Sequence, residues 1–243
     1  MSDNDRDNIR AFNLRLTSNL ARSAFNQLQH SFSHKLDLDS LYMSNRRLAI
    51  LAGVTPLLIN MCISSCIAYM RQYKNLTHCP SCKEPRKANS KPWRQFSYLP
   101  VIPHLQGFFR NPETVQLLAY RHTYKPSEDE IDDVFDGDLY RELCNTYVVV
   151  DGVQRLYKFF SGKHDIALGV GMDSYLIFGK RAGHGGPFAT PIIVKLYNFP
   201  GKIRIHIKFI MFLGTIPGPR ALKDAGLFLA PFDDELVELA NGV

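Results

Sequence analysis

Two pairs of closely spaced cysteines are the residues of this chain best suited to chemistry. Cys62 and Cys66 form a C-x3-C pair, Cys79 and Cys82 form a C-x2-C pair, and twelve residues separate the two pairs. Zinc prefers four soft or borderline ligands in a tetrahedron, with Zn–S distances of about 2.3 Å. Short turns let each pair present two thiolates to one side. The spacing therefore predicts one structural zinc ion, while Cys144 stands alone and is expected to be a buried apolar side chain.

The surroundings of the cysteines are basic and aromatic. Trp93, Phe96 and Tyr98 follow the second pair. Basic side chains beside aromatic ones can bind phosphates and stack on bases, so DNA is a candidate partner. The alternative is a charged surface whose aromatic residues face the core. The candidate DNA-binding residues are Arg71, Lys74, Lys83, Arg86, Lys87, Lys91 and Arg94.

Charge is unevenly divided along the 243 residues, whose formal net charge is +6. Residues 1–126 hold 17 Lys and Arg against 7 Asp and Glu, whereas residues 127–243 hold 12 against 16. A basic half joined to an acidic half indicates that one part meets a polyanion, or that the surface is uneven and solvated. The hydrophobic content of 45% excludes a disordered chain.

The compartment follows from the start of the chain and the use of cysteine. The first ten residues, MSDNDRDNIR, contain no apolar segment of a signal peptide. Residues 48–70 carry no charge and are long enough to span a membrane. They also contain Gly53, Pro56, Asn60 and two of the four clustered cysteines, which disfavours a span. We expect an intracellular protein, nuclear or cytoplasmic, that is neither secreted nor membrane-bound.

Helical periodicity dominates the first part of the chain. Apolar residues recur at three- and four-residue steps in residues 8–32, which predicts a helix there. A second helix is predicted over residues 41–52, ended by Gly53 and Pro56. After the cysteines, an extended segment should lead into a short helix near Pro103. Residues 127–138 hold seven acids in twelve positions, which indicates a solvated linker or loop.

Strand patterns begin near residue 165. Alternation predicts strands at 165–172, 191–197 and 202–214, and residues 226–239 then form a helix rich in leucine and acids. The predicted class is α+β. Its expected parts are a helical region (1–59), a four-cysteine zinc module with a proline- and aromatic-rich segment (60–125), an acidic linker region (126–160) and an incomplete RNase H-like unit of three strands and a helix (161–243).

Several long motifs resemble one known family. CISSC, HCPSCKEPR, FSYLPVIPHLQGFF, KFFSGKHDIALGVGMDSYLIF, TPIIVKLYNFP and GTIPGPRALKD occur in this order. They resemble the CACTA-type (En/Spm) DNA transposases, especially copies found in mushroom-forming fungi. The resemblance covers most of the chain from about Arg46 onward, and the first 45 residues add little to it.

The resemblance implies an RNase H-like domain that cuts and joins transposon ends with two metal ions held by an acidic triad. The position that matches the first acid is Asp173, in ALGVGMDSYLIF. Ser174 departs from the family glycine that follows this acid, and Lys87 stands where an aromatic residue is common. The second and third acids have no counterpart, because the chain ends after the first helix. Mg²⁺ is therefore expected only for the complete family enzyme.

Three functions follow as expectations. The first is a C-terminally truncated cut-and-paste transposase that retains zinc and is not an active enzyme by itself. The second is a zinc-dependent nucleic-acid-binding or interaction module without catalysis. The third is self-association through an unpaired sheet edge. Ser161, His164 and Asp165 are close in the chain, but proximity in sequence does not predict the geometry of a hydrolase triad.

Overall fold

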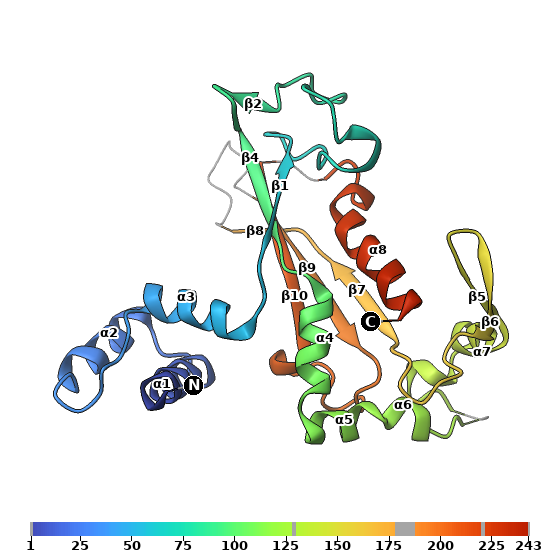
Figure 1. Ribbon diagram of the computed structural model, residues 1–243, viewed down its shortest axis with the longest axis horizontal. Coiled ribbons are helices and arrows are strands. Elements are labelled where there is room, and N and C mark those ends of the chain that lie inside the picture. The colour runs from blue at the N-terminus through green and yellow to red at the C-terminus, as the bar shows by residue number, and fades with distance from the viewer. Residues whose placement is uncertain (1, 128–129, 178–187, 220–221, 243) are drawn as a thin grey trace. The chain divides into compact units, whose positions relative to one another are not determined.

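The computed structural model of the chain describes residues 2–127, 130–177, 188–219 and 222–242 (Figure 1). The chain forms two compact units, Met1–Thr55 and Pro56–Val243. The predicted helical region (1–59) extends four residues beyond the first unit. The other three predicted parts all lie within the second unit. The predicted α+β class is confirmed, because helices and an antiparallel sheet are both present.

The first unit contains the helices α1 (Asp3–Thr17), α2 (Arg22–Ser31) and α3 (Leu41–Ala52). The prediction of one helix over residues 8–32 is wrong, because the chain turns between α1 and α2 with Asn19 at a φ of 49°. The predicted helix over residues 41–52 is confirmed at both ends. Gly53 stops it in the left-handed conformation that glycine adopts readily. Phe25, Leu38 and Leu41 form the buried apolar centre of this unit.

A six-stranded antiparallel sheet organises the second unit (Figure 1). Its strand order is β1-β4-β10-β9-β7, and β8 pairs with β9 beside β7. The strands are β1 (Leu57–Met61), β4 (Arg94–Tyr98), β7 (Leu168–Met172), β8 (Tyr175–Leu176), β9 (Phe188–Leu196) and β10 (Ile210–Gly218). The predicted strands at 165–172 and 191–197 correspond to β7 and β9.

Two strands of this sheet come from the part of the chain that holds the cysteines. β1 ends directly before Cys62, and β4 follows the short hairpin of β2 (Lys87–Ala88) and β3 (Lys91–Pro92). β4 pairs with both β1 and β10. Gly214 makes the second pairing feasible, because a Cβ at this position would collide with the carbonyl oxygen of Ser97. The cysteine segment (residues 60–87) is thus an excursion between two strands of the sheet.

Two helices cover one face of the sheet and form the core with it (Figure 1). They are α4 (Val101–Phe109), which begins two residues before the predicted start at Pro103, and α8 (Gly226–Asn241), which contains the predicted helix over 226–239. The Glu235 carboxylate of α8 accepts hydrogen bonds from the backbone N–H groups of Val101 and Ile102, at 2.9 and 3.0 Å, and from the Tyr98 hydroxyl. An acid at a helix N-terminus satisfies otherwise unpaired donors.

The predicted strand at 202–214 is wrong in its first half. Residues 201–206 form turns, a 3-10 helix η3 (Ile207–Phe209) follows, and the strand begins at Ile210. The reason is Arg204, which is buried and forms an ion pair with Asp133. A strand here would place its alternating basic residues in solvent, whereas in the structure Arg204 is buried.

The acidic segment also differs from the solvated linker that was predicted. Asp133 and Asp136 are buried, and the 3-10 helix η2 (Val134–Asp136) lies between helices α6 (Tyr120–Thr123) and α7 (Asp138–Asn145) in the chain. Asp136 accepts hydrogen bonds from the Tyr124 hydroxyl and from backbone amides, which lower its pKa to about 2. Two carboxylates of this segment therefore bind it to the fold.

The remaining elements of the second unit are the 3-10 helix η1 (Arg71–Tyr73), α5 (Pro112–Leu118), and the hairpin of β5 (Tyr147–Val150) and β6 (Val153–Lys158). None of the described helices has the length and apolar character needed to cross a membrane. The uncharged residues 48–70 are divided among the end of α3, strand β1 and the first cysteine turn.

Candidate metal centre

The predicted convergence of four cysteines is confirmed. The Sγ atoms of Cys62, Cys66, Cys79 and Cys82 all lie within 4.8 Å of one another, and those of Cys62 and Cys82 are 3.3 Å apart. Four thiolates at about 2.3 Å from a common ion would be about 3.8 Å apart in a tetrahedron. The arrangement could therefore hold one metal ion with small movements of the side chains. Cys144 is separate from this cluster and half-buried.

Each cysteine pair is formed by a tight turn whose backbone is specified locally. In the first turn, the Ser64 N–H donates to Cys62 Sγ at 3.3 Å, and Ser65 takes a φ of 60°. In the second turn, the backbone N–H of Lys83 donates to the Cys79 carbonyl at 2.9 Å, and Lys83 takes a φ of 64°. Both turns point sulfur atoms inward and need a residue in the left-handed region.

Burial controls the protonation of the thiols. It raises the pKa of Cys62 to about 12 and also raises the pKa of Cys66. At Cys82, burial acts in the same direction, but hydrogen bonds from the Glu84 backbone and from the other cysteines outweigh it and lower the pKa to about 7. Without a cation the deeper thiols therefore stay protonated. A bound dication would favour the thiolates, so binding would release protons and weaken as the pH falls.

Two side chains of the cysteine segment, Ser65 and Arg71, make polar contacts with β10 and α8. Ser65, which is fully buried, donates from its hydroxyl to the Pro217 carbonyl of β10 at 2.9 Å. Arg71 pairs with Asp234 of α8 at 2.7 Å and donates to the Ala230 carbonyl at 3.2 Å. No sequence signal marked these contacts, because they join residues about 150 positions apart.

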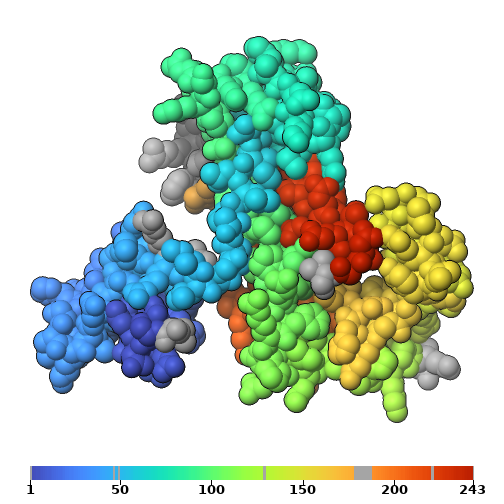
Figure 2. Space-filling model, in the orientation of Figure 1, coloured from blue at the N-terminus to red at the C-terminus, as the bar shows by residue number. Residues whose placement is uncertain are grey.

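The structure divides the seven basic residues predicted to bind DNA. Arg71 is engaged with α8, as described above. Arg86 donates to the Lys74 carbonyl at 2.6 Å and stacks on the Tyr69 ring at 4.7 Å, while the Lys83 ammonium donates to the Pro80 carbonyl. Arg94 is half-buried. Lys74, Lys87 and Lys91 have exposed side chains. The segment that contains them, residues 74–91, is coloured cyan to green in Figure 2.

The three aromatic residues after the cysteines are also divided. Phe96 and Tyr98 are buried in the core, with exposed fractions of 1% and 0%. Trp93 is 50% exposed. Two of the three rings therefore face the core, as the alternative interpretation expected, and the third faces solvent.

Asp173 lies on the β7–β8 edge of the sheet and is exposed. Met172 pairs with Ile192 and Tyr175 with Ala189, so both strands keep the same register against β9. In that register Asp173 faces Pro191, which has no N–H to donate. Within the described part of the chain, the four cysteines are the only group of three or more His, Cys, Asp or Glu side chains positioned to hold an ion. Among the described residues, Asp173 is therefore not part of a cluster of carboxylates that could hold a metal ion.

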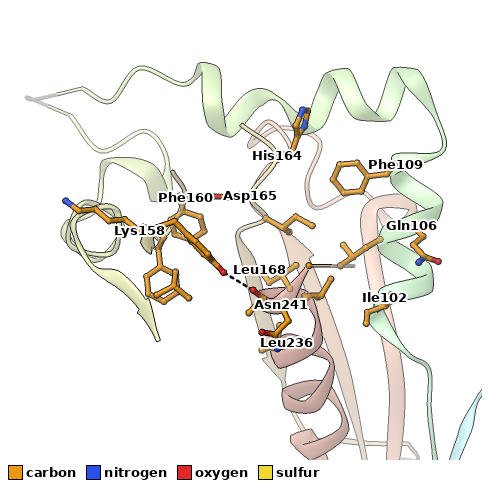
Figure 3. Close-up of a pocket in the computed structure, with 18 residues that line it drawn as sticks. Ile102, Gln106, Phe109, Lys158, Phe160, His164, Asp165, Leu168, Leu236 and Asn241 are labelled. Atoms are coloured by element: carbon orange, nitrogen blue, oxygen red, sulfur yellow. Dashed lines mark hydrogen bonds between the residues drawn. The ribbon is translucent and has the colours of Figure 1, made fainter. Parts of the chain in front are cut away.

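A cavity of about 800 Å³ lies between α4, the β5–β6 hairpin and the last turn of α8 (Figure 3). Its wall is mostly apolar and includes His164 and Asp165. The Asp165 carboxylate accepts from the Gly162 N–H at 2.7 Å, and buried Arg121 holds the Asp165 carbonyl at 3.0 Å. Among the described residues no hydrogen bond joins His164 to Ser161 or Asp165. These three residues do not form a hydrolase triad.

The fold and the site define a class: an α+β unit whose sheet carries a buried four-cysteine centre able to hold a metal ion. No protein-family model, no curated protein and no solved structure matches the chain.

Proposed function

We propose that this chain is the zinc- and DNA-binding part of a cut-and-paste transposase of the CACTA type. The observation that carries the proposal is the convergence of four cysteine sulfur atoms within 4.8 Å. An all-thiol site is typical of structural zinc, since it leaves no open coordination position. The ordered sequence motifs resemble those of the transposase family, and this resemblance is the reason to propose DNA as the partner.

The position of the exposed lysines supports DNA binding. Lys87 and Lys91 belong to the β2–β3 hairpin, and Lys74 lies between the two cysteine pairs in the chain. A metal ion that fixes the two cysteine turns would therefore also fix the surface that presents these charges. Phosphate contacts by lysines give binding that weakens steeply as salt increases.

We expect the double variant K87Q/K91Q to bind a DNA duplex on the order of 10-fold more weakly than the native chain at low salt. Each lost phosphate contact should also reduce the slope of log K against log salt by about 0.9. Gel-shift titrations over a range of salt measure both quantities. A suitable control is K163Q/K202Q, which removes two exposed lysines at the other end of the sheet. No retardation of DNA by the native protein at low salt would contradict DNA binding.

A second part of the proposal concerns the sheet. We infer that β7, β9, β10 and α8 are the beginning of an RNase H-like unit, with Asp173 at the position of the first metal-binding acid. The supporting observation is that β7, β9 and β10 are antiparallel neighbours in the sheet and are followed in the chain by a helix packed on it. One carboxylate cannot hold two cations about 3.5–4 Å apart, so we propose that this chain alone does not cleave DNA.

Incubation of the zinc-loaded protein with labelled DNA and Mg²⁺ or Mn²⁺ tests the last point. We expect no cleavage above the background of a protein-free sample. Cleavage that disappears in the Asp173→Asn variant would show that the described carboxylates suffice for catalysis. Cleavage that persists in that variant would instead indicate a contaminating nuclease.

A further inference from the structure

A row of exposed side chains leads away from the candidate metal centre along β3 and β4. From Lys91 to Tyr98, exposed residues alternate with less exposed ones. The exposed set is Lys91, Trp93, Gln95 and Ser97. Alternation with a period of two places these four side chains on one side of the extended segment. Six residue steps of about 3.3 Å make this row about 20 Å long.

Trp93 is the unusual member of the row. Half of its surface is exposed, and no aromatic ring among the described residues stacks on it. Its backbone is fixed, because the Trp93 N–H donates to the Arg86 carbonyl at 3.1 Å. Arg86 is in turn held by the Lys74 carbonyl and the Tyr69 ring. A large flat ring thus stands in solvent on a backbone anchored beside the four cysteines.

The neighbours of Trp93 suit a nucleotide strand. Lys91 provides a charge for a phosphate, two positions before the indole. The side-chain amides of Gln95 and Asn60 lie 3.0 Å apart across the β1–β4 pair, which places the Gln95 amide two positions after the indole. Amide side chains can hydrogen-bond base edges. Along the row, Lys91 would therefore contact a phosphate, Trp93 the face of a base and Gln95 the edge of a base.

An intact duplex cannot use this arrangement fully. Its bases are stacked on one another, so only their edges are accessible in the grooves. An unpaired strand exposes base faces, and stacking on an aromatic side chain is the typical mode of single-strand recognition. We propose that Trp93 is a stacking platform for an unpaired base, and that the row of Lys91, Trp93, Gln95 and Ser97 binds single-stranded DNA. This rests on the proposed DNA-binding function and specifies its ligand.

The single tryptophan makes the test direct, because the intrinsic fluorescence of the full chain reports on this position alone. The zinc-loaded protein is titrated with oligothymidylate of about 12 nucleotides and, separately, with a duplex of equal length. We expect quenching by the single strand and an affinity for it about 10-fold tighter than for the duplex at equal salt. Labelled oligothymidylate and anisotropy then compare the variants.

Trp93→Ala should weaken single-strand binding by about 5- to 100-fold, whereas Trp93→Phe, which keeps a ring, should retain most of it. Zinc content and thermal unfolding of both variants check that the fold persists. If the duplex binds as tightly as the single strand and the fluorescence does not change, the stacking platform is refuted while DNA binding stands. Equal binding by Trp93→Ala and the native chain also refutes it. Absence of binding to either DNA at low salt overturns the DNA-binding function itself.

Discussion

Replacement of Cys79 by serine is expected to abolish zinc binding and to destabilise the second unit. Cys79 is fully buried among the other three cysteines, so no water ligand can easily replace its sulfur. Structural zinc contributes about 10–16 kcal/mol of binding free energy in small peptides at neutral pH, and this energy stabilises the folded state. Elemental analysis should find about one zinc per native chain and almost none in Cys79→Ser.

The loss of stability in Cys79→Ser should extend beyond the cysteine segment. β1 and β4 flank the cysteines, and Ser65 and Arg71 connect them to β10 and α8. A loss of about 5 kcal/mol would lower the midpoint of thermal unfolding by about 10–20 °C in a unit of this size. Removal of the metal from the native chain by a chelator should give a similar shift in the same calorimetric measurement.

Cys144→Ser is the matched control, since Cys144 is a half-buried cysteine outside the cluster. It should keep its zinc and change the free energy of unfolding by less than about 1 kcal/mol. If Cys79→Ser retained a full zinc equivalent, or if Cys144→Ser lost it, the assignment of the four ligands would be incorrect.

The second large effect is expected at the buried ion pair between the acidic segment and residue 204. The Arg204 and Asp133 side chains are only 8% and 4% exposed, and Arg204 Nη1 donates to Asp133 Oδ1 at 3.0 Å. The guanidinium also donates to the Phe199 carbonyl. Asp133→Asn keeps the shape of the side chain but leaves a buried cation without its counter-charge. We expect a loss of about 3–5 kcal/mol in the free energy of unfolding, measured by urea denaturation.

Asp138→Asn provides the comparison within the same acidic segment. The Asp138 side chain is fully exposed and its nearest Arg141 nitrogen is 4.0 Å away. Such surface pairs contribute about 0–1 kcal/mol. A similar small change in both variants would mean that residues 127–138 behave as the solvated linker that their composition predicts, and that the ion pair does not dock them to the fold.

Local sequence patterns predict the structure correctly where a residue's neighbours in sequence fix its environment. Two closely spaced cysteine pairs need only short turns to converge, so their spacing predicted the cluster. The helix over residues 41–52 ends at Gly53 for reasons contained in a few residues. β7, β9 and α8 likewise follow from apolar residues that recur along short stretches of sequence. In each case propensity and burial favour the same structure.

The errors in residues 202–209 and 127–138 arise from side-chain partners elsewhere in the chain, whereas the error in residues 8–32 is a local turn at Asn19. The alternation in residues 202–209 is typical of a strand. In the structure, Arg204 instead pairs with the buried carboxylate of Asp133, 71 positions earlier, and the residues around it form turns. The composition of residues 127–138 predicts a linker. In the structure, Tyr124 binds the Asp136 carboxylate and Arg204 binds the Asp133 carboxylate, and both acids are buried. A buried charge is costly unless it is paired, so Arg204 and Asp133 are stable in the interior only when both are buried together.

The sequence alone determined the four metal-binding candidates, the α+β class and the elements α3, β7, β9 and α8, since these depend on spacing and periodicity over short distances. Only the tertiary structure decided that the cysteine segment lies between β1 and β4, two paired strands of the main sheet. Only the tertiary structure separated exposed Trp93 from buried Phe96 and Tyr98, and the exposed lysines from the engaged arginines. Which side of a strand is covered depends on helices from remote parts of the chain, and sequence periodicity cannot name them.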